Sequence, residues 1–178
     1  MLIPAGSHIY KCFHEAGHIE IALLSGARVT FCEVPPVGDP RTNVIHKPDF
    51  STKKPIACGG YSVEVILFEQ GKLANADGTG LTELAFQQQA MGNARLDKCP
   101  FYLTKNPGPD GIWPNTPFQP NPDGTWPPES DAPFIEYALQ RVVPLLQSRM
   151  VIIEALASML TTTPLDEEEI DAIRRDFS

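Results

Sequence analysis

The stretch Tyr10-Lys11-Cys12-Phe13-His14-Glu15-Ala16-Gly17-His18 decides the fold, because it forms the middle of an amphipathic helix. We predict this helix from about Ser7 to Gly26, where Ser7 suits an N-cap and Gly26 suits a stop. Apolar or small residues recur along it at helical spacing, at Phe13, Gly17, Ile21 and Leu24. The sequence therefore predicts a largely buried helix near the N-terminus.

His14 and His18 stand four residues apart, which places both imidazoles on one face of this helix, one turn apart. There they could share a zinc ion, with bonds of roughly 2.0–2.1 Å. Glu15 is placed to take a proton from an attacking water molecule that zinc acidifies. The alternative is a helix carrying two surface histidines without a metal. The apolar surroundings, and the presence here of two of only 4 histidines, favour a zinc site.

Two short strands are predicted after this helix, over Arg28–Val34 and Thr42–Lys47. The turn-rich residues 35–40 join them, so we expect a hairpin or two edge strands. Metallopeptidases of the helical type can hold an extended substrate as an added strand on a sheet edge. Arg28–Val34 could serve this purpose, or it could be purely structural.

Further helices are predicted over Ile56–Glu69, Leu81–Met91 and Phe134–Met159, and from about Asp166 to the end. Gly59 and Gly60 inside the first of these predict close backbone packing against another element. Pro144 predicts a kink in the third, and Glu169 suits a capping box in the last.

Residues 100–133 hold ten of the 18 prolines, which forbids a continuous helix or a central strand. This segment could be a long surface loop, or a lid or partner-binding segment. With 178 residues, 42% of them hydrophobic and 20% charged, the chain fits one globular domain with a proline-rich insertion.

The net charge of -8 argues against a nucleic-acid-binding surface and predicts a mild bias against acidic substrates. No apolar run approaches the roughly 20 residues that span a bilayer, and the first residues do not resemble a signal peptide. We therefore expect a cytoplasmic protein without a membrane segment. The cysteines are expected to be free thiols in a reducing compartment, with Cys12 as a buried structural thiol.

These motifs resemble the peptidase domain of the FtsH-type ATP-dependent zinc proteases, whose metal-binding helix carries HEAGH. The stretch from Cys58 to Phe68 is similar to the family's GGRAAE helix, with Gly59, Gly60 and Glu64 matching and Tyr61 replacing the Arg. Residues 23–34 and 153–170 also resemble the corresponding parts of that domain. The resemblance covers most of the chain except the proline-rich segment.

The resemblance implies a mainly helical, zincin-like α+β domain over residues 1–178, with a small sheet. It also implies a zinc metalloendopeptidase that cleaves peptides or unfolded chains without an ATPase of its own, since no Gly-x-x-x-x-Gly-Lys loop occurs. A homo-oligomer, or a partner contact through the proline-rich segment, could follow. The alternative function is a non-catalytic peptide- or partner-binding module that kept the fold with an incomplete metal site.

The third zinc ligand lies outside the histidine motif, because the family takes it from an Asp at the start of the helix after the Gly-Gly helix. Counting from Gly59 and Gly60 without gaps leads next to Asp77. Aligning on the helix at 81–91 leads to Gly80, with Glu83 one turn beyond. We expect Asp77, with Glu83 as the second choice and an absent third ligand as the remaining alternative.

Two other polar residues could belong to the site. The resemblance places Glu64 near the metal, where it could accept a hydrogen bond from a ligand imidazole, or it could face solvent. His46 could line the cleft as an oxyanion or substrate contact, or be an ordinary strand histidine. His8 is assigned no role.

Overall fold

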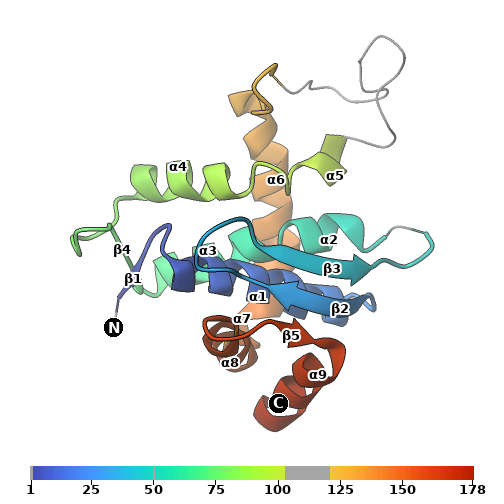
Figure 1. Cartoon of the computed structure of the whole chain (residues 1–178). Coiled ribbons are helices and arrows are strands. Elements are labelled where there is room, and N and C mark those ends of the chain that lie inside the picture. The colour runs from blue at the N-terminus through green and yellow to red at the C-terminus, as the bar shows by residue number, and fades with distance from the viewer. Residues whose placement is uncertain (1, 50, 103–120) are drawn as a thin grey trace.

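The structure is a computed structural model that describes residues 2–49, 51–102 and 121–178 (Figure 1). It is a mixed α+β fold in which helices predominate, with small sheets of two and three strands. This confirms the predicted fold class. The helices are α1 (His8–Leu24), α2 (Lys53–Ala57), α3 (Gly59–Glu69), α4 (Glu83–Asn93), α5 (Cys99–Tyr102), α6 (Asp131–Tyr137), α7 (Val143–Gln147), α8 (Met150–Leu160) and α9 (Glu167–Phe177). The strands are β1 (Ile3–Pro4), β2 (Arg28–Glu33), β3 (Arg41–Ile45), β4 (Leu73–Ala74) and β5 (Leu165–Asp166).

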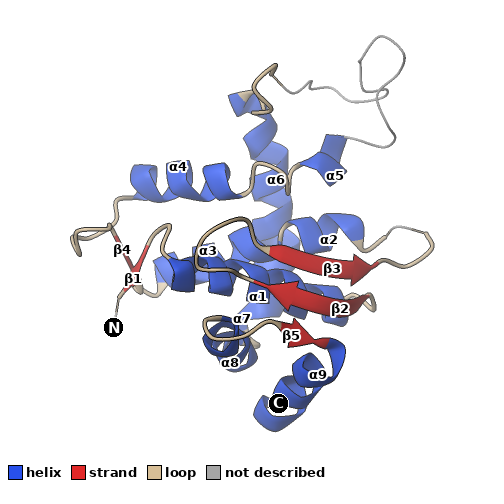
Figure 2. Cartoon of the chain, viewed as in Figure 1, coloured by secondary structure: helices blue, strands red, loops and turns tan. Residues whose placement is uncertain are grey.

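The predicted ends of α1 are confirmed by their capping contacts. The Ser7 hydroxyl accepts a hydrogen bond from the backbone N–H of Tyr10 at 3.3 Å. At the other end Gly26 has φ +84, and the Ala27 N–H donates to the carbonyl of Ala22 at 2.9 Å. This left-handed glycine with its backward hydrogen bond is a Schellman motif, which stops the helix. Figure 2 shows α1 in the middle of the molecule, between the helices and the three-stranded sheet.

The close packing expected at Gly59 is confirmed, and its partner is Gly17 of α1. A Cβ added to Gly17 would lie 2.4 Å from the Gly59 carbonyl oxygen, and one added to Gly59 would lie 2.6 Å from the Gly17 oxygen. The prediction of one helix over Ile56–Glu69 is wrong, because Cys58 interrupts it and separates α2 from α3. The Ile56 carbonyl lies beside this break, where a side chain of α1 can reach it.

The predicted hairpin is confirmed, since β2 and β3 pair antiparallel within a sheet of order β3-β2-β5. Of the two interpretations of Arg28–Val34, the structure favours the structural one, because β5 pairs with Phe31 and Cys32 on the second side of β2. Within the described residues the sheet therefore has β3 and the two-residue β5 at its edges, and β3 is the edge strand that contacts α1. The two-residue strands β1, β4 and β5 are too short to leave an alternating pattern in the sequence.

The region predicted as one kinked helix over Phe134–Met159 contains two changes in the helical path. A π-helical turn over Ala138–Val142 joins α6 to α7, just before Pro144, and accommodates the missing N–H of the proline. The chain then turns by 90° between Gln147 and Met150. The capping box of α9 is confirmed, with Asp166 and Glu169 bonding each other's backbone N–H.

Among the described residues no single helix is long and apolar enough to cross a membrane. The helical segments Pro128–Gln147 and Met150–Leu160 reach that length and apolarity only when taken together, and they are bent by 90°.

Both interpretations of the proline-rich segment fall mainly on residues 103–120, which lie outside the described residues. The two flanks of that stretch contact each other. Lys98 Nζ donates to Asp131 Oδ1 at 2.5 Å, and the Phe101 ring lies edge-to-face against Phe134 at 5.5 Å between centroids. The flanks are thus joined next to the turn that follows α4.

Candidate metal centre

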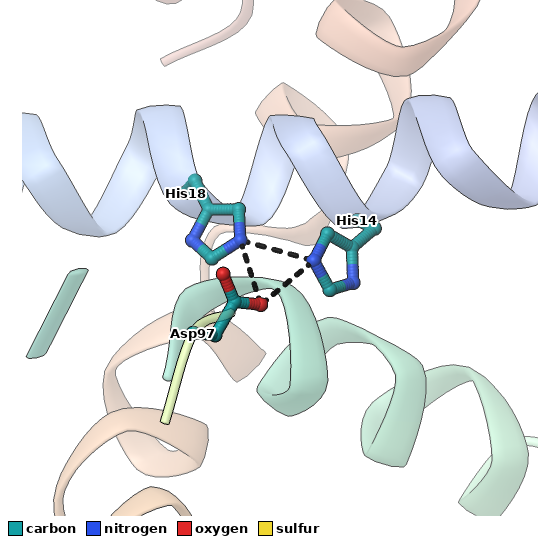
Figure 3. A group of neighbouring side chains, drawn as sticks. All are labelled: His14, His18 and Asp97. Carbon is teal, nitrogen blue, oxygen red and sulfur yellow. Dashed lines mark hydrogen bonds and ion pairs between the residues drawn. The ribbon is translucent and has the colours of Figure 1, made fainter. Parts of the chain in front are cut away.

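His14 and His18 point from α1 toward a common position (Figure 3). Their Nε2 atoms lie 3.0 Å apart, and each residue is 7% exposed. The shared direction follows from the four-residue spacing on a helix, as predicted.

The other nitrogen of each imidazole is held by an acceptor from the α2–α3 region. His14 Nδ1 donates to Glu64 Oε1 at 2.6 Å, and His18 Nδ1 donates to the Ile56 carbonyl at 2.6 Å. A neutral imidazole that donates through Nδ1 presents a lone pair at Nε2. Both lone pairs therefore face the same position. The predicted hydrogen bond between Glu64 and one of the two imidazoles is confirmed, and Asn93 donates to the same Glu64 oxygen at 3.0 Å.

The third group is Asp97, in the turn after α4. Its Oδ2 lies 3.1 Å from His14 Nε2 and 3.4 Å from His18 Nε2. Ligand atoms at the corners of a tetrahedron around zinc, with bonds of roughly 2.0–2.1 Å, are about 3.3 Å apart. The three donor atoms therefore fit one face of such a tetrahedron, and this buried group could hold a metal ion.

The electrostatics of the three groups favour a positive charge between them. Burial lowers the pKa of His14, but the carboxylates of Glu64 and Asp97 outweigh it and raise this pKa well above its ordinary value. Burial raises the pKa of Asp97, yet the two histidines outweigh it and hold this pKa well below the usual range. Three converging lone pairs repel one another unless protons or a cation lie between them. A metal cation meets that requirement.

The expected third ligand was assigned to the wrong residue, because Asp97 and not Asp77 lies beside the histidines. Asp77 is exposed in a turn, where its Oδ1 accepts hydrogen bonds from the Thr79 backbone at 3.0 Å and hydroxyl at 2.6 Å. Glu83, the second choice, is exposed at the start of α4.

The path of α4 explains this correction. The helix has 11 residues and is about 16 Å long, so it carries the chain from the exposed turn back over α1 (Figure 1). Its C-terminal end, rather than its start, lies over the histidines. A search for acids at both ends of the predicted helix would have included Asp97, since it stands only a few residues beyond Met91.

Glu15 lines the same cleft as His14, His18 and Asp97, and this cleft has a volume of about 890 Å³. Glu15 Oε2 accepts a hydrogen bond from Thr42 Oγ1 at 2.5 Å, and this contact links α1 to the edge strand β3. Thr42 and Val44 line the cleft along that strand. The predicted catalytic carboxylate is thus held at the mouth of the candidate metal centre.

His46 also lines the cleft, beyond the end of β3. Its Nδ1 lies 2.9 Å from the Thr52 hydroxyl, and burial together with the charge of Lys53 lowers its pKa. A neutral His46 can donate a hydrogen bond to a molecule in the cleft. His8 instead lies 2.7 Å from the Val34 carbonyl, a structural contact.

The cysteines are free, as predicted. Burial raises the pKa of the Cys12 thiol to about 11. A thiol with such a pKa is unreactive at neutral pH, which agrees with a structural role.

The structure thus brings His14, His18, Glu15 and Glu64 together as predicted, and adds Asp97. Gly60 completes the arrangement, because it leaves room for the His14 ring. No protein-family model matches the chain, and no curated protein matches it.

Proposed function

We propose that this protein is a zinc-dependent metallopeptidase that cleaves peptides or unfolded chains. The observation that carries the proposal is the triangle of His14, His18 and Asp97 donor atoms, which opens into the same cleft as Glu15. Two imidazoles, one carboxylate and an open fourth position make up the donor set of many catalytic zinc sites. The resemblance of HEAGH and the Gly-Gly helix to FtsH-type peptidase domains supports the same function.

Each polar residue of the centre then has a distinct role. Zinc, when bound, polarises the carbonyl of the substrate and makes water more acidic. Glu15 takes the proton of the attacking water and passes it to the leaving amine. Thr42 orients the Glu15 carboxylate through its hydrogen bond. Glu64 orients the His14 ring and increases its basicity as a ligand.

The edge strand β3 is suited to hold the substrate. It pairs with β2 on one side, and Thr42 and Val44 on it line the cleft. An extended peptide can add to such an edge through backbone hydrogen bonds, with its bond to be cleaved over the metal. The cleft volume of about 890 Å³ is large enough for several residues of a peptide.

The alternative of a non-catalytic binding module depended on an incomplete set of ligands. Asp97 supplies a third donor at 3.1 and 3.4 Å from the two histidines. Since Glu15 also lines the cleft, the arrangement favours catalysis over binding alone.

The proposal is tested by measuring the zinc content and the peptidase activity of matched variants. Asp97→Asn is expected to lower zinc affinity, while Asp77→Asn in the exposed turn leaves it unchanged. Glu15→Gln is expected to retain zinc but lose about 10²–10⁴-fold in rate, the usual contribution of a general base. Wild-type protein that binds no zinc on titration, or Glu15→Gln protein that cleaves peptides at the wild-type rate, would refute the proposal.

A further inference from the structure

The Glu15 carboxylate is held from the sheet rather than from its own helix. Its Oε2 accepts the hydrogen bond from Thr42 Oγ1 at 2.5 Å, and Thr42 lies on β3, which contacts α1. Among the described residues no hydrogen bond reaches Oε1, the other oxygen of this carboxylate. The direction of the carboxylate therefore depends on one hydroxyl group.

The Thr42 hydroxyl has a second polar neighbour, the thiol of Cys32. Cys32 Sγ lies 3.2 Å from Thr42 Oγ1. The two residues are directly opposite each other in the antiparallel pair of β2 and β3, so their side chains lie on the same face of the sheet. Cys32 is completely buried, whereas Thr42 is half-buried and lines the cleft. Cys32, Thr42 and Glu15 thus form a chain of contacts that runs from the core to the cleft.

The hydrogens available to these three groups fix the direction of both hydrogen bonds. An ionised carboxylate can only accept, so the single hydrogen of the Thr42 hydroxyl is directed to Glu15. The contact between Thr42 and Cys32 then needs the hydrogen of the thiol, which is a weak donor. Burial raises the pKa of Cys32 to about 12; the hydrogen bond with Thr42 opposes this rise, and the charge of Glu15 adds to it. Cys32 therefore keeps its hydrogen at neutral pH and can donate it.

We infer that Cys32 is a positioning residue for the general base, because its thiol donates to the Thr42 hydroxyl and that hydroxyl donates to Glu15 Oε2. A hydroxyl rotates about its C–O bond to suit its partners, and a donor on the lone-pair side restricts this rotation. With Oε2 occupied in this way, Oε1 is the oxygen that takes the proton of the attacking water. The inference rests on the proposed peptidase function and assigns the atoms that orient its general base.

Steady-state cleavage of one peptide by zinc-loaded variants tests this role. Cys32→Ala removes the donor and is expected to reduce kcat by about 2–10-fold, the contribution of one neutral hydrogen bond, with KM and zinc affinity unchanged. Cys32→Ser keeps a donor at the same place, so its kcat is expected to stay within about twofold of the wild type, even where urea unfolding shows a loss of stability. Cys12→Ala is the matched control and is expected to leave kcat unchanged. It removes another buried thiol, whose polar neighbour is His8 and not Thr42.

The infrared S–H stretching band of Cys32 tests the hydrogen bond without any cleavage. Its loss in Cys32→Ala protein identifies the band. Thr42→Val removes the acceptor and keeps the branched shape of the side chain, so the Cys32 band is expected to move to higher frequency. Thr42→Ser keeps the acceptor and is expected to leave the band in place. A shift in Thr42→Val protein supports the hydrogen-bond chain, even if wild-type protein cleaves nothing and the peptidase function fails.

Three results would overturn the inference while leaving the peptidase function in place. The first is a Cys32 band that does not move in Thr42→Val protein, because the thiol would then donate nothing to Thr42. The second is Cys32→Ala protein that cleaves at the wild-type rate. The third is an equal loss of kcat in Cys32→Ser or in Cys12→Ala protein, because the thiol would then act only through packing.

Discussion

Gly60→Ala is expected to displace His14, a ligand of the proposed zinc site, without removing any polar group. A Cβ at this position would lie 2.3 Å from Cε1, 2.4 Å from Nε2 and 2.5 Å from Cδ2 of His14. Ordinary van der Waals contacts begin at 3.4 Å, so the ring must move away by about 1 Å. Metal–ligand distances tolerate only about 0.2 Å. The ring also cannot rotate freely, because Glu64 holds its Nδ1 at 2.6 Å.

We expect Gly60→Ala to lower zinc affinity by at least about 10–100-fold, the loss seen when ligand-orienting groups are removed. Overpacking is also expected to reduce the free energy of unfolding of the metal-free protein by about 1–3 kcal/mol. The two effects are measured separately. Zinc affinity comes from competition with a chromophoric chelator, and stability comes from urea unfolding with all metal removed.

Gly92→Ala is the matched control, since an added Cβ there meets nothing within 4 Å. Because Gly92 lies in α4, alanine is expected to stabilise the protein by about 0.5–1 kcal/mol and to leave zinc affinity unchanged. If folded Gly60→Ala protein binds zinc as tightly as the wild type, the packing of His14 against Gly60 is refuted.

Three further predictions concern pH and buried charges. In metal-free protein the raised pKa of His14 means that the folded state holds this proton more tightly than the unfolded chain. The contribution of His14 to the free energy of unfolding is thus complete below about pH 6.5 and is lost as the pH rises through the raised pKa of the folded state. Zinc affinity instead rises with pH. Urea unfolding with and without zinc, measured across this pH range, checks both trends. Glu20→Gln, which removes a fully buried carboxylate bound by two arginines, is expected to cost about 3–5 kcal/mol in urea unfolding, and an unchanged midpoint would contradict this. Asp131→Asn leaves the buried Lys98 ammonium without its carboxylate, so it is expected to lower the free energy of unfolding by about 1–3 kcal/mol. It is also expected to lower zinc affinity, because Lys98 adjoins Asp97. The exposed Glu129→Gln should change neither measurement by more than about 0.5 kcal/mol.

Local contacts explain which parts of this protein could be predicted. The ends of α1 follow from Ser7 and Gly26, whose capping partners lie within a few residues. The convergence of His14 and His18 follows from the helical repeat, and the capping box of α9 from a spacing of three residues. Each of these interactions joins neighbours along the chain, so residue spacing alone was sufficient to predict it.

Two other contacts join residues that lie far apart in the sequence, so residue spacing could not predict them. Gly59 packs against Gly17, and Glu64 bonds His14 across 50 residues of sequence. The resemblance placed Glu64 near the metal-binding histidines, whereas close packing was expected from Gly59 and Gly60 themselves; the break at Cys58 was not expected. Small residues at 59 and 60 are themselves a signal of close approach, since any larger side chain would collide with α1.

The sequence by itself determined the histidine pair, the adjacent Glu15 and the helix that carries them, because a helix places residues four apart on one face. Only the tertiary structure decided that Asp97 completes the donor set, since this depends on the path of α4 over α1 and not on any spacing. The same holds for β3 as the sheet edge, which required the short strand β5 to cover β2.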